Sequence, residues 1–173
     1  MPELIYYKDI TKEWLGDKPI SENIVKMYNV GDTYTFRKNK YKVDGHFIKY
    51  SFDEGEKDFA LWLSTKTNKT ITLMPKIEKP ENIRSPDFKI NHDYYDLKTI
   101  HGNSRQVVYH KIKGKYTQAT KFFFDVLESS QLTLNDLIFQ INELFKSTNP
   151  DRSWVELIGI RYQNEFIILK RLK

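Results

Sequence analysis

Residues 86–98 read PDFKINHDYYDLK, and this stretch decides how the middle of the chain folds. Two β-prone segments, PDFKI and YYDLKTI, flank the polar residues 91–93, and Gly102 closes the second segment. A short polar turn between two such segments is typical of a β-hairpin. The sequence therefore predicts two antiparallel strands, with Asp87 opening one strand and Asp96 lying on its partner.

The hairpin places residues with hydrolytic chemistry close together. Side chains two apart on a strand share a face, so Asp96 and Lys98 emerge on the same side, and the turn can bring Asp87 there too. Phosphodiester cleavage needs an in-line water and neutralisation of the phosphate charge, and Mg²⁺ held by one or two carboxylates supplies much of this. We predict Asp87 and Asp96 as metal ligands, the Leu97 carbonyl as a further ligand, and Lys98 as the group that orients water or stabilises the transition state.

A helix predicted after residue 53 adds a fourth candidate. Glu56, Phe59, Ala60 and Leu63 follow the i, i+3, i+4, i+7 spacing of one helical face. A carboxylate that faces a core is costly without a partner, so Glu56 needs a metal or a cation such as Lys98.

The remaining pattern predicts a mixed α/β (α+β) domain in which helices flank a mixed sheet. The segments DTYTFR, KYKVD and HFIKYSF alternate as strands, ITLMP and KFFFD are short apolar strands, and WVELIGIR with EFIILKRL forms a terminal hairpin. LTLNDLIFQINELFK is the clearest helix, and helical spacing also runs from Ser104 to Ala119 despite Gly114. We place the domain at residues 31–173 and interpret residues 1–30 as a small N-terminal arm.

Composition limits the possible functions. The 173 residues contain no cysteine, which excludes disulfides, thiol nucleophiles and cysteine-ligated metals. No apolar run is long enough for a membrane span, and the start MPELIYYKDI is too charged for a secretory signal, so we expect a cytoplasmic site of action. The net charge of +5 and pI near 9.1 favour polyanionic partners.

Residues 86–98 also resemble the PD-(D/E)XK signature of restriction-endonuclease-like nucleases, with aspartate where glutamate is commoner. Glu56 with ALWL, the LMP end of the next strand, and the Gln118 segment before KFFFD are similar to C-terminal tRNA nuclease domains of contact-dependent inhibition (CdiA) toxins and to related phage-associated domains. The resemblance covers roughly residues 31–173. It implies a restriction-endonuclease-like fold, Mg²⁺ or Mn²⁺ as cofactor, tRNA or other RNA as substrate, a neutralising immunity protein as partner, and four catalytic residues: Glu56, Asp87, Asp96 and Lys98.

A basic segment follows the hairpin. Lys111, Lys113, Lys115 and Lys121 follow Arg105 and could track a phosphate backbone. We predict the nucleic-acid-binding residues to be Arg105, Lys113, Lys115 and Gln118, while solvated surface is the alternative for the lysines.

Other interpretations stay open. Asp87 could be an ordinary turn residue, and Asp96 with Lys98 could be an ordinary surface pair. Glu56 could lie near a helix N-terminus, where the helix dipole favours a carboxylate. A metal-independent ribonuclease would use histidines, with His101 the best candidate among His46, His92, His101 and His110. A DNA endonuclease of the restriction or junction-resolving type would use the same metal core, and a non-catalytic nucleic-acid-binding or phage structural module is the alternative from another class.

Overall fold

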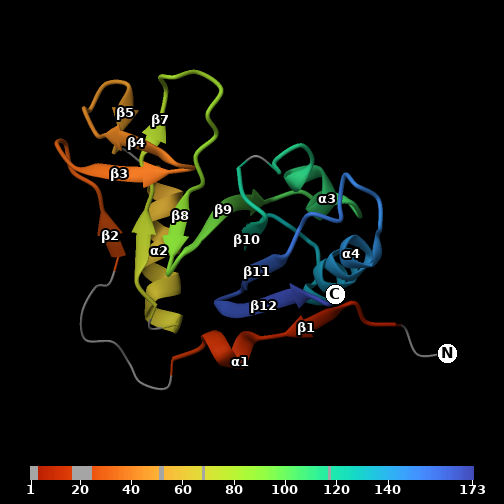
Figure 1. Cartoon of the computed structure of the whole chain (residues 1–173). Helices are drawn as coiled ribbons and strands as arrows, with labels where there is room; N and C mark the ends of the chain where they lie inside the picture. Colours follow the sequence, from red (N-terminus) through yellow and green to blue (C-terminus); the bar gives the residue numbers. More distant parts are fainter. Residues whose placement is uncertain (1–3, 17–24, 51–52, 68, 117) are drawn as a thin grey trace. The chain divides into compact units, whose positions relative to one another are not determined.

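A computed structural model describes residues 4–16, 25–50, 53–67, 69–116 and 118–173 (Figure 1). The chain divides into two compact units: unit 1 comprises Met1–Leu15 and Asp96–Lys173, and unit 2 comprises Gly16–Tyr95. The predicted arm over residues 1–30 is shared between the units, because residues 4–15 belong to unit 1 and residues 25–30 to unit 2. Residues 1–3 and 17–24 of that arm lie outside the described part, and the domain boundary at residue 30 stays a prediction.

Unit 2 contains a small mixed sheet packed against one long helix. Strand β2 (Val25–Met27) runs parallel to β6 (Ile71–Leu73), and β6 is antiparallel to β8 (Phe88–Ile90). The helix α2 (Glu54–Thr67) buries Phe59, Ala60 and Leu63 completely, as its spacing predicted. Phe59 stacks on Phe88 with ring centroids 6.0 Å apart, so the helix is fixed on the strand that follows Asp87.

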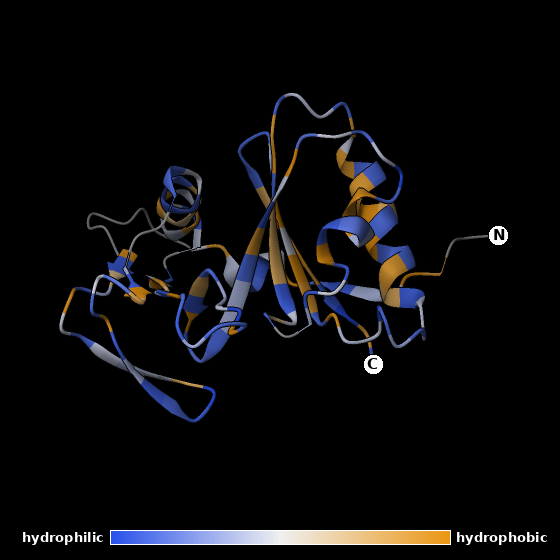
Figure 2. Ribbon diagram, turned by 90° about the horizontal axis from the view of Figure 1, so that it is seen from above, coloured by the Kyte–Doolittle hydropathy of each residue, from blue (hydrophilic) through white to orange (hydrophobic). Residues whose placement is uncertain are grey.

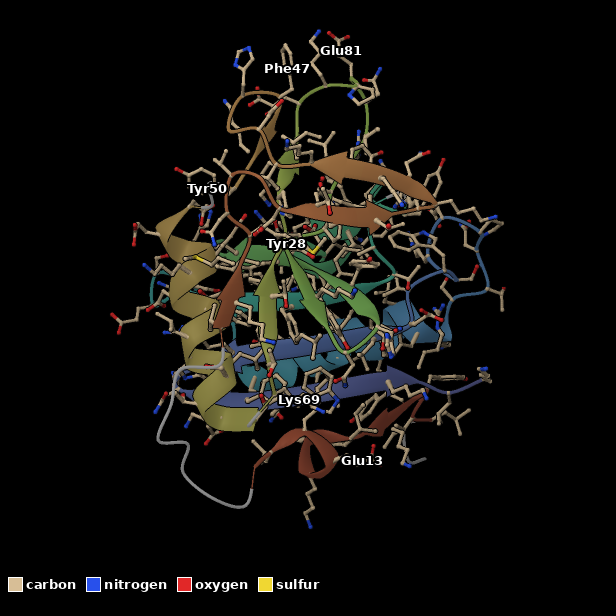
Figure 3. The ribbon with its side chains drawn as sticks, turned by 60° about the vertical axis from the view of Figure 1, so that its left-hand side comes forward. Glu13, Tyr28, Phe47, Tyr50, Lys69 and Glu81 are labelled. Carbon is tan, nitrogen blue, oxygen red and sulfur yellow. The ribbon has the colours of Figure 1, made fainter. Side chains whose placement is uncertain are left out.

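Two shorter ladders complete unit 2. Strand β3 (Thr33–Phe36) pairs with β4 (Asn39–Lys42), and β5 (Ile48–Lys49) pairs with β7 (Lys76–Ile77). The loops beside β5 and β7 carry exposed side chains, Phe47 and Glu81 among them (Figure 3).

The predicted hairpin is confirmed. Strand β9 (Asp93–Ile100) begins antiparallel to β8, with Ile90 opposite Asp93 and Phe88 opposite Tyr95. Only two residues make the turn, and Asn91 adopts a φ of +56°, which asparagine tolerates better than most residues. Asp87 lies just before β8, where its N–H donates to the Tyr95 carbonyl at 3.0 Å.

Unit 1 is built on a mixed sheet in the order β1 (Tyr7–Asp9), β12 (Glu165–Arg171), β11 (Leu157–Tyr162), β10 (Lys121–Val126) and β9. Strand β12 is antiparallel to both of its neighbours, β1 and β11, whereas β11, β10 and β9 are parallel. The helices are α1 (Thr11–Trp14), α3 (Val107–Ile112) and α4 (Leu134–Lys146). Hydrophobic residues line the central strands and α4 (Figure 2).

Alternation along β10 explains the core of unit 1. Phe122 and Phe124 belong to a buried cluster that includes residues of α3 and α4. Phe123 lies between them and faces the other way, where its ring centroid is 6.1 Å from that of Trp14 in α1. All three phenylalanines are buried, so β10 is covered on both faces. Mixed sheets flanked by helices confirm the predicted fold class.

One predicted element is wrong in extent. The helix expected from Ser104 to Ala119 is confined to α3, because Gly114 adopts a φ of +74° just after it and turns the chain. Among the described residues, no helix has the length and apolar character that crossing a membrane requires.

Candidate functional site

Two predicted site residues meet around a lysine in unit 2. The Lys76 Nζ lies 2.5 Å from Asp87 Oδ1 and 3.3 Å from Glu56 Oε1. Helix α2 supplies Glu56, strand β7 supplies Lys76, and the residue before β8 supplies Asp87. Asp87 is 7% exposed, so its charge would be costly without this partner. The expected cation beside Glu56 is therefore present within this unit, and it is Lys76.

Burial and charge set the protonation of this cluster. Burial first, then the charge of Asp87 and a hydrogen bond between the two carboxyl groups, raise the pKa of Glu56 to about 8. Burial lowers the pKa of Lys76, but the charges of Asp87 and Glu56 outweigh it and leave that pKa raised. Near neutral pH the Lys76 side chain is therefore an ammonium, and the Glu56 carboxyl group holds its proton. A carboxyl group whose pKa lies near the working pH is suited to proton transfer.

Lys76 is the site residue that sequence reasoning missed. The Met74 N–H donates to the Asp87 carbonyl at 3.0 Å, which brings the segment after β6 alongside Asp87. Met74 and Ile77 are both buried, so Lys76 stands in a short apolar run. A lone lysine within such a run was the available signal, because its ammonium needs a carboxylate nearby.

The other predicted pair lies on β9 in unit 1. Asp96 is 1% exposed, and its Oδ2 lies 2.6 Å from the Lys98 Nζ. The two residues share a face of the strand, as predicted, and they stand opposite Phe122 and Phe124 of β10. An exposed pair was the alternative interpretation, and the burial of Asp96 contradicts it. Leu97 lies between them on β9.

The carboxyl groups of both clusters, Glu56 with Asp87 and Asp96 beside Lys98, are ligands that suit a hard cation. Carboxylate oxygens are the ligands that Mg²⁺ and Mn²⁺ prefer, and one or two suffice for Mg²⁺ because it keeps several waters. Lys76 bridges Glu56 and Asp87, so a positive charge already stands between these two carboxyl groups. No group of three or more acidic or histidine side chains suited to a metal occurs in the described part of the chain.

The predicted nucleic-acid-binding residues all lie in unit 1 but differ in setting. Arg105 lines a cavity of about 300 Å³, and Lys113 lines another of about 550 Å³. Lys115 and Gln118 follow α3 and are half-buried. The nucleic-acid role of these residues stays a prediction.

The four histidines are exposed. The ring of His46 packs against the ring of Phe47. His101 follows β9 in a loop of unit 1. The histidine alternative thus gains no buried acid–base pair from the described residues.

Comparison with known proteins gives a partial family match. Residues 84–166 match the model of the contact-dependent growth inhibition CdiA C-terminal domain. The matched segment is just under half of the chain and includes the hairpin with Asp87, Asp96 and Lys98. No curated protein matches the chain.

One solved structure is similar at low identity. It is the CdiA-CT/CdiI toxin and immunity complex from Burkholderia pseudomallei. It is 19% identical, covers 67% of this chain and 82% of its own, and has a TM-score of 0.49.

Proposed function

We propose that the protein is a metal-dependent nuclease of the PD-(D/E)XK type that hydrolyses phosphodiester bonds in RNA. The observation that carries this proposal is the buried Asp96 whose carboxylate contacts Lys98 two residues later, on the strand that follows the PD hairpin. Surface lysine–aspartate pairs are common, but an aspartate that is 1% exposed has a high desolvation cost and points to a role for its charge.

The proposed roles follow from the chemistry of each group. Asp87, Asp96 and the Leu97 carbonyl would hold Mg²⁺ or Mn²⁺, which supplies charge neutralisation and a more acidic bound water. The Lys98 ammonium, held by Asp96, would stabilise the negative charge that develops on the phosphate. Glu56, which shares the Lys76 ammonium with Asp87, would act in proton transfer beside the metal.

The biological setting rests on similarity. The partial match to the CdiA C-terminal domain supports a toxin-like effector that acts in the cytoplasm of a target cell. Under this proposal the substrate is tRNA or another RNA, and the cognate partner is a neutralising immunity protein.

The test incubates the protein with total tRNA, other RNA and plasmid DNA in the presence of Mg²⁺, Mn²⁺ or EDTA. Asp96→Asn and Lys98→Met should each lower the cleavage rate by roughly a hundredfold or more, because each removes a charge needed in the transition state. Lys170→Met is the matched control, since Lys170 is an exposed lysine on a strand of the same unit. Circular dichroism establishes that each variant is folded.

Three outcomes would count against the proposal. Cleavage that persists in EDTA would exclude the metal mechanism, and full activity in both folded variants would exclude the assigned residues. Cleavage of plasmid DNA without cleavage of any RNA would instead support the DNA endonuclease.

A further inference from the structure

A cavity of about 550 Å³ opens in unit 1 between the end of α3 and the loop that follows α4. Aromatic rings form much of its wall. Its lining includes Tyr109, Lys113, Tyr116, Pro150, Asp151 and Trp154. None of these residues belongs to the carboxylate–lysine pairs described above.

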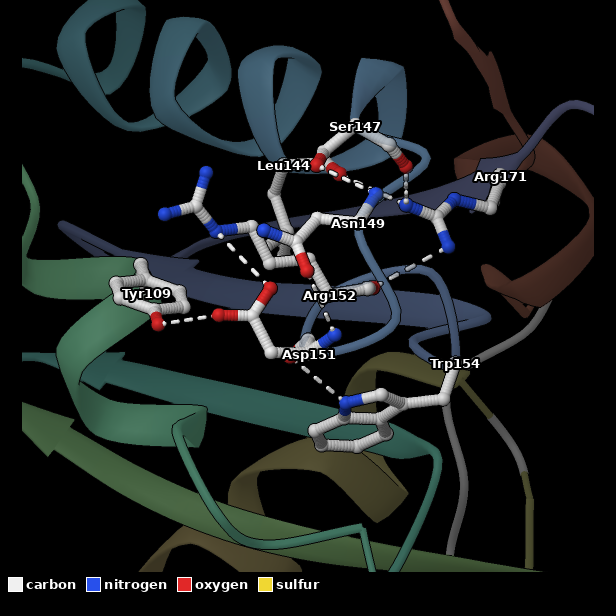
Figure 4. A network of polar contacts seen from close by, with 8 residues as sticks. All are labelled: Tyr109, Leu144, Ser147, Asn149, Asp151, Arg152, Trp154 and Arg171. Carbon is white, nitrogen blue, oxygen red and sulfur yellow. Dashed lines mark hydrogen bonds and ion pairs between the residues drawn. The ribbon is translucent and has the colours of Figure 1, made fainter.

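Hydrogen bonds hold two of the rings in place (Figure 4). The Trp154 Nε1–H donates to the Asp151 carbonyl at 2.9 Å, and the Tyr109 hydroxyl donates to the Asp151 carboxylate at 2.7 Å. Arg152 places its guanidinium 4.2 Å from the centre of the Tyr109 ring. Rings fixed in this way lose little conformational entropy when a ligand stacks on them.

Arg171 of β12 fixes the loop that carries Asp151 and Trp154 (Figure 4). Its guanidinium donates to the Leu144 carbonyl at the end of α4 at 2.7 Å and to the Arg152 carbonyl at 3.3 Å, and it also bonds the Ser153 carbonyl. Both ends of the loop are therefore tied to β12.

Tyr116 forms the outer wall of the cavity. Its side chain is 64% exposed, and its ring meets Trp154 edge-on, with centroids 6.2 Å apart and planes at 67°. The turn at Gly114 redirects the chain after α3 and places Tyr116 beside the loop. The neighbouring residues thus leave much of the Tyr116 ring in contact with water, where a ligand can stack on it.

The segment around α3, which supplies one wall of the cavity, is basic. Residues 97–124 contain no aspartate or glutamate, but they contain six lysines and arginines: Lys98, Arg105, Lys111, Lys113, Lys115 and Lys121. Two of these, Lys98 and Lys121, lie beside the carboxyl groups of Asp96 and Glu156. The acidic Asp151 at the cavity already accepts from Tyr109 and lies 3.7 Å from the Arg152 Nε. A second cavity of about 300 Å³ shares Tyr109 and is lined by Arg105 and Arg152 together with one acid, Glu143.

We propose that the cavity beside Tyr116 and Trp154 binds an unpaired base of single-stranded RNA, with the adjoining phosphates on Lys113 and Arg105. This inference rests on the proposed nuclease function and names the kind of RNA structure that the enzyme holds. Aromatic rings stack on bases of any sequence, whereas bases within a duplex are already stacked and paired. A cationic ligand is disfavoured because Lys113 lies in the wall and the one acid there, Asp151, already accepts from Tyr109 and lies beside Arg152.

The test measures the affinity of the full-length protein for a fluorescein-labelled oligouridine and for a blunt RNA duplex by fluorescence anisotropy. EDTA in the buffer prevents metal-dependent cleavage, and one salt concentration is used throughout because phosphate contacts depend on salt. Tyr116→Ala should weaken oligouridine binding by roughly five- to a hundredfold, the effect of losing one base–aromatic stack. Duplex affinity should be unchanged.

Matched variants separate stacking from other effects. Tyr116→Phe keeps the ring and should bind like the wild type. Tyr50→Ala removes another exposed tyrosine, in unit 2, and should also leave binding unchanged. Lys113→Ala should weaken binding to both RNAs, because a phosphate contact does not depend on base pairing.

The outcomes also separate this inference from the proposed nuclease function. Metal-dependent cleavage with unchanged oligouridine affinity in Tyr116→Ala would overturn the inference alone and leave a protein as the candidate occupant. Loss of oligouridine affinity in Tyr116→Ala without any cleavage by the wild type would support the inference and overturn the nuclease. Failure of the wild type to bind oligouridine would overturn the inference.

Discussion

Replacing Glu56 by glutamine should remove a specific part of the pH dependence of stability. The pKa of Glu56 is raised from 4.5 to about 8 in the folded chain, so the folded state binds this proton more tightly than the unfolded state does. Stability from this group is greatest below pH 4.5 and is lost as the pH rises toward 8. Glutamine resembles the protonated acid in shape and does not titrate.

The size of the effect follows from the linkage between pKa and stability. Each unit of pKa difference is equivalent to about 1.4 kcal/mol. Between pH 6 and pH 9 the unfolded Glu56 is ionised throughout, whereas the folded Glu56 loses its proton near pH 8, so only the interval from 6 to 8 contributes. The wild type should therefore lose about 3 kcal/mol relative to Glu56→Gln over this range.

Urea unfolding of the wild type and Glu56→Gln at both pH values, in EDTA, measures this difference. Glu54→Gln is the matched control, because Glu54 starts the same helix but is exposed. Carboxyl carbon NMR would report the midpoint of Glu56 directly. Parallel stability curves for wild type and Glu56→Gln, or a midpoint close to 4.5, would refute the reasoning. Addition of Mg²⁺ should shrink the difference if a metal binds these carboxylates, since a cation favours the ionised form.

Three further predictions concern the stability of unit 1 and are measured by urea or thermal unfolding. Gly159→Ala should cost about 1–3 kcal/mol, because the new Cβ would lie 2.7 Å from the Phe123 Cδ1 and 3.2 Å from the Phe166 Cε1; Gly102→Ala, with no heavy atom within 4 Å, should cost far less. Thr133→Ala should lower the free energy of unfolding by about 1 kcal/mol, because it removes the hydroxyl that accepts the Asp136 N–H in the capping box of α4. Thr133→Ser keeps a hydroxyl and should lose much less stability. Arg171→Met should cost about 2–3 kcal/mol and alter the fluorescence of Trp154, because it leaves the carbonyls of the 147–154 loop without their donor; an unchanged midpoint would contradict the role assigned to Arg171.

Local pattern was sufficient for the parts of the fold that obey one strong rule. The hairpin from 86 to 100 follows from a polar turn between two β-prone runs, and α2 follows from the spacing of Phe59, Ala60 and Leu63. The prediction for the segment after Ser104 was wrong in extent because the apolar spacing continues past Gly114, where the backbone turns. Spacing records which side chains share a face but carries less information about where a helix ends.

The candidate site shows the same division between local and non-local information. Asp96 and Lys98 are two residues apart, so their shared face could be predicted from the strand alone. Lys76 meets Glu56 across 20 positions and Asp87 across 11, and those distances depend on how β6, β7 and α2 pack. Long-range ion pairs of this kind are set by tertiary structure, and one sequence contains little trace of them.

The lysines of this chain also separate into two kinds, which changes how its basic charge is interpreted. Lys76 and Lys98 contact buried carboxyl groups, so their charges compensate the burial of Asp87 and Asp96. Arg105 and Lys113 are of the other kind: they lie in the segment 97–124, which contains no acid, and they line cavities with aromatic walls. Net charge alone would suit any polyanion, duplex or single-stranded. Aromatic rings beside those cations favour a strand whose bases are unpaired, because a duplex offers its phosphates but not its base faces.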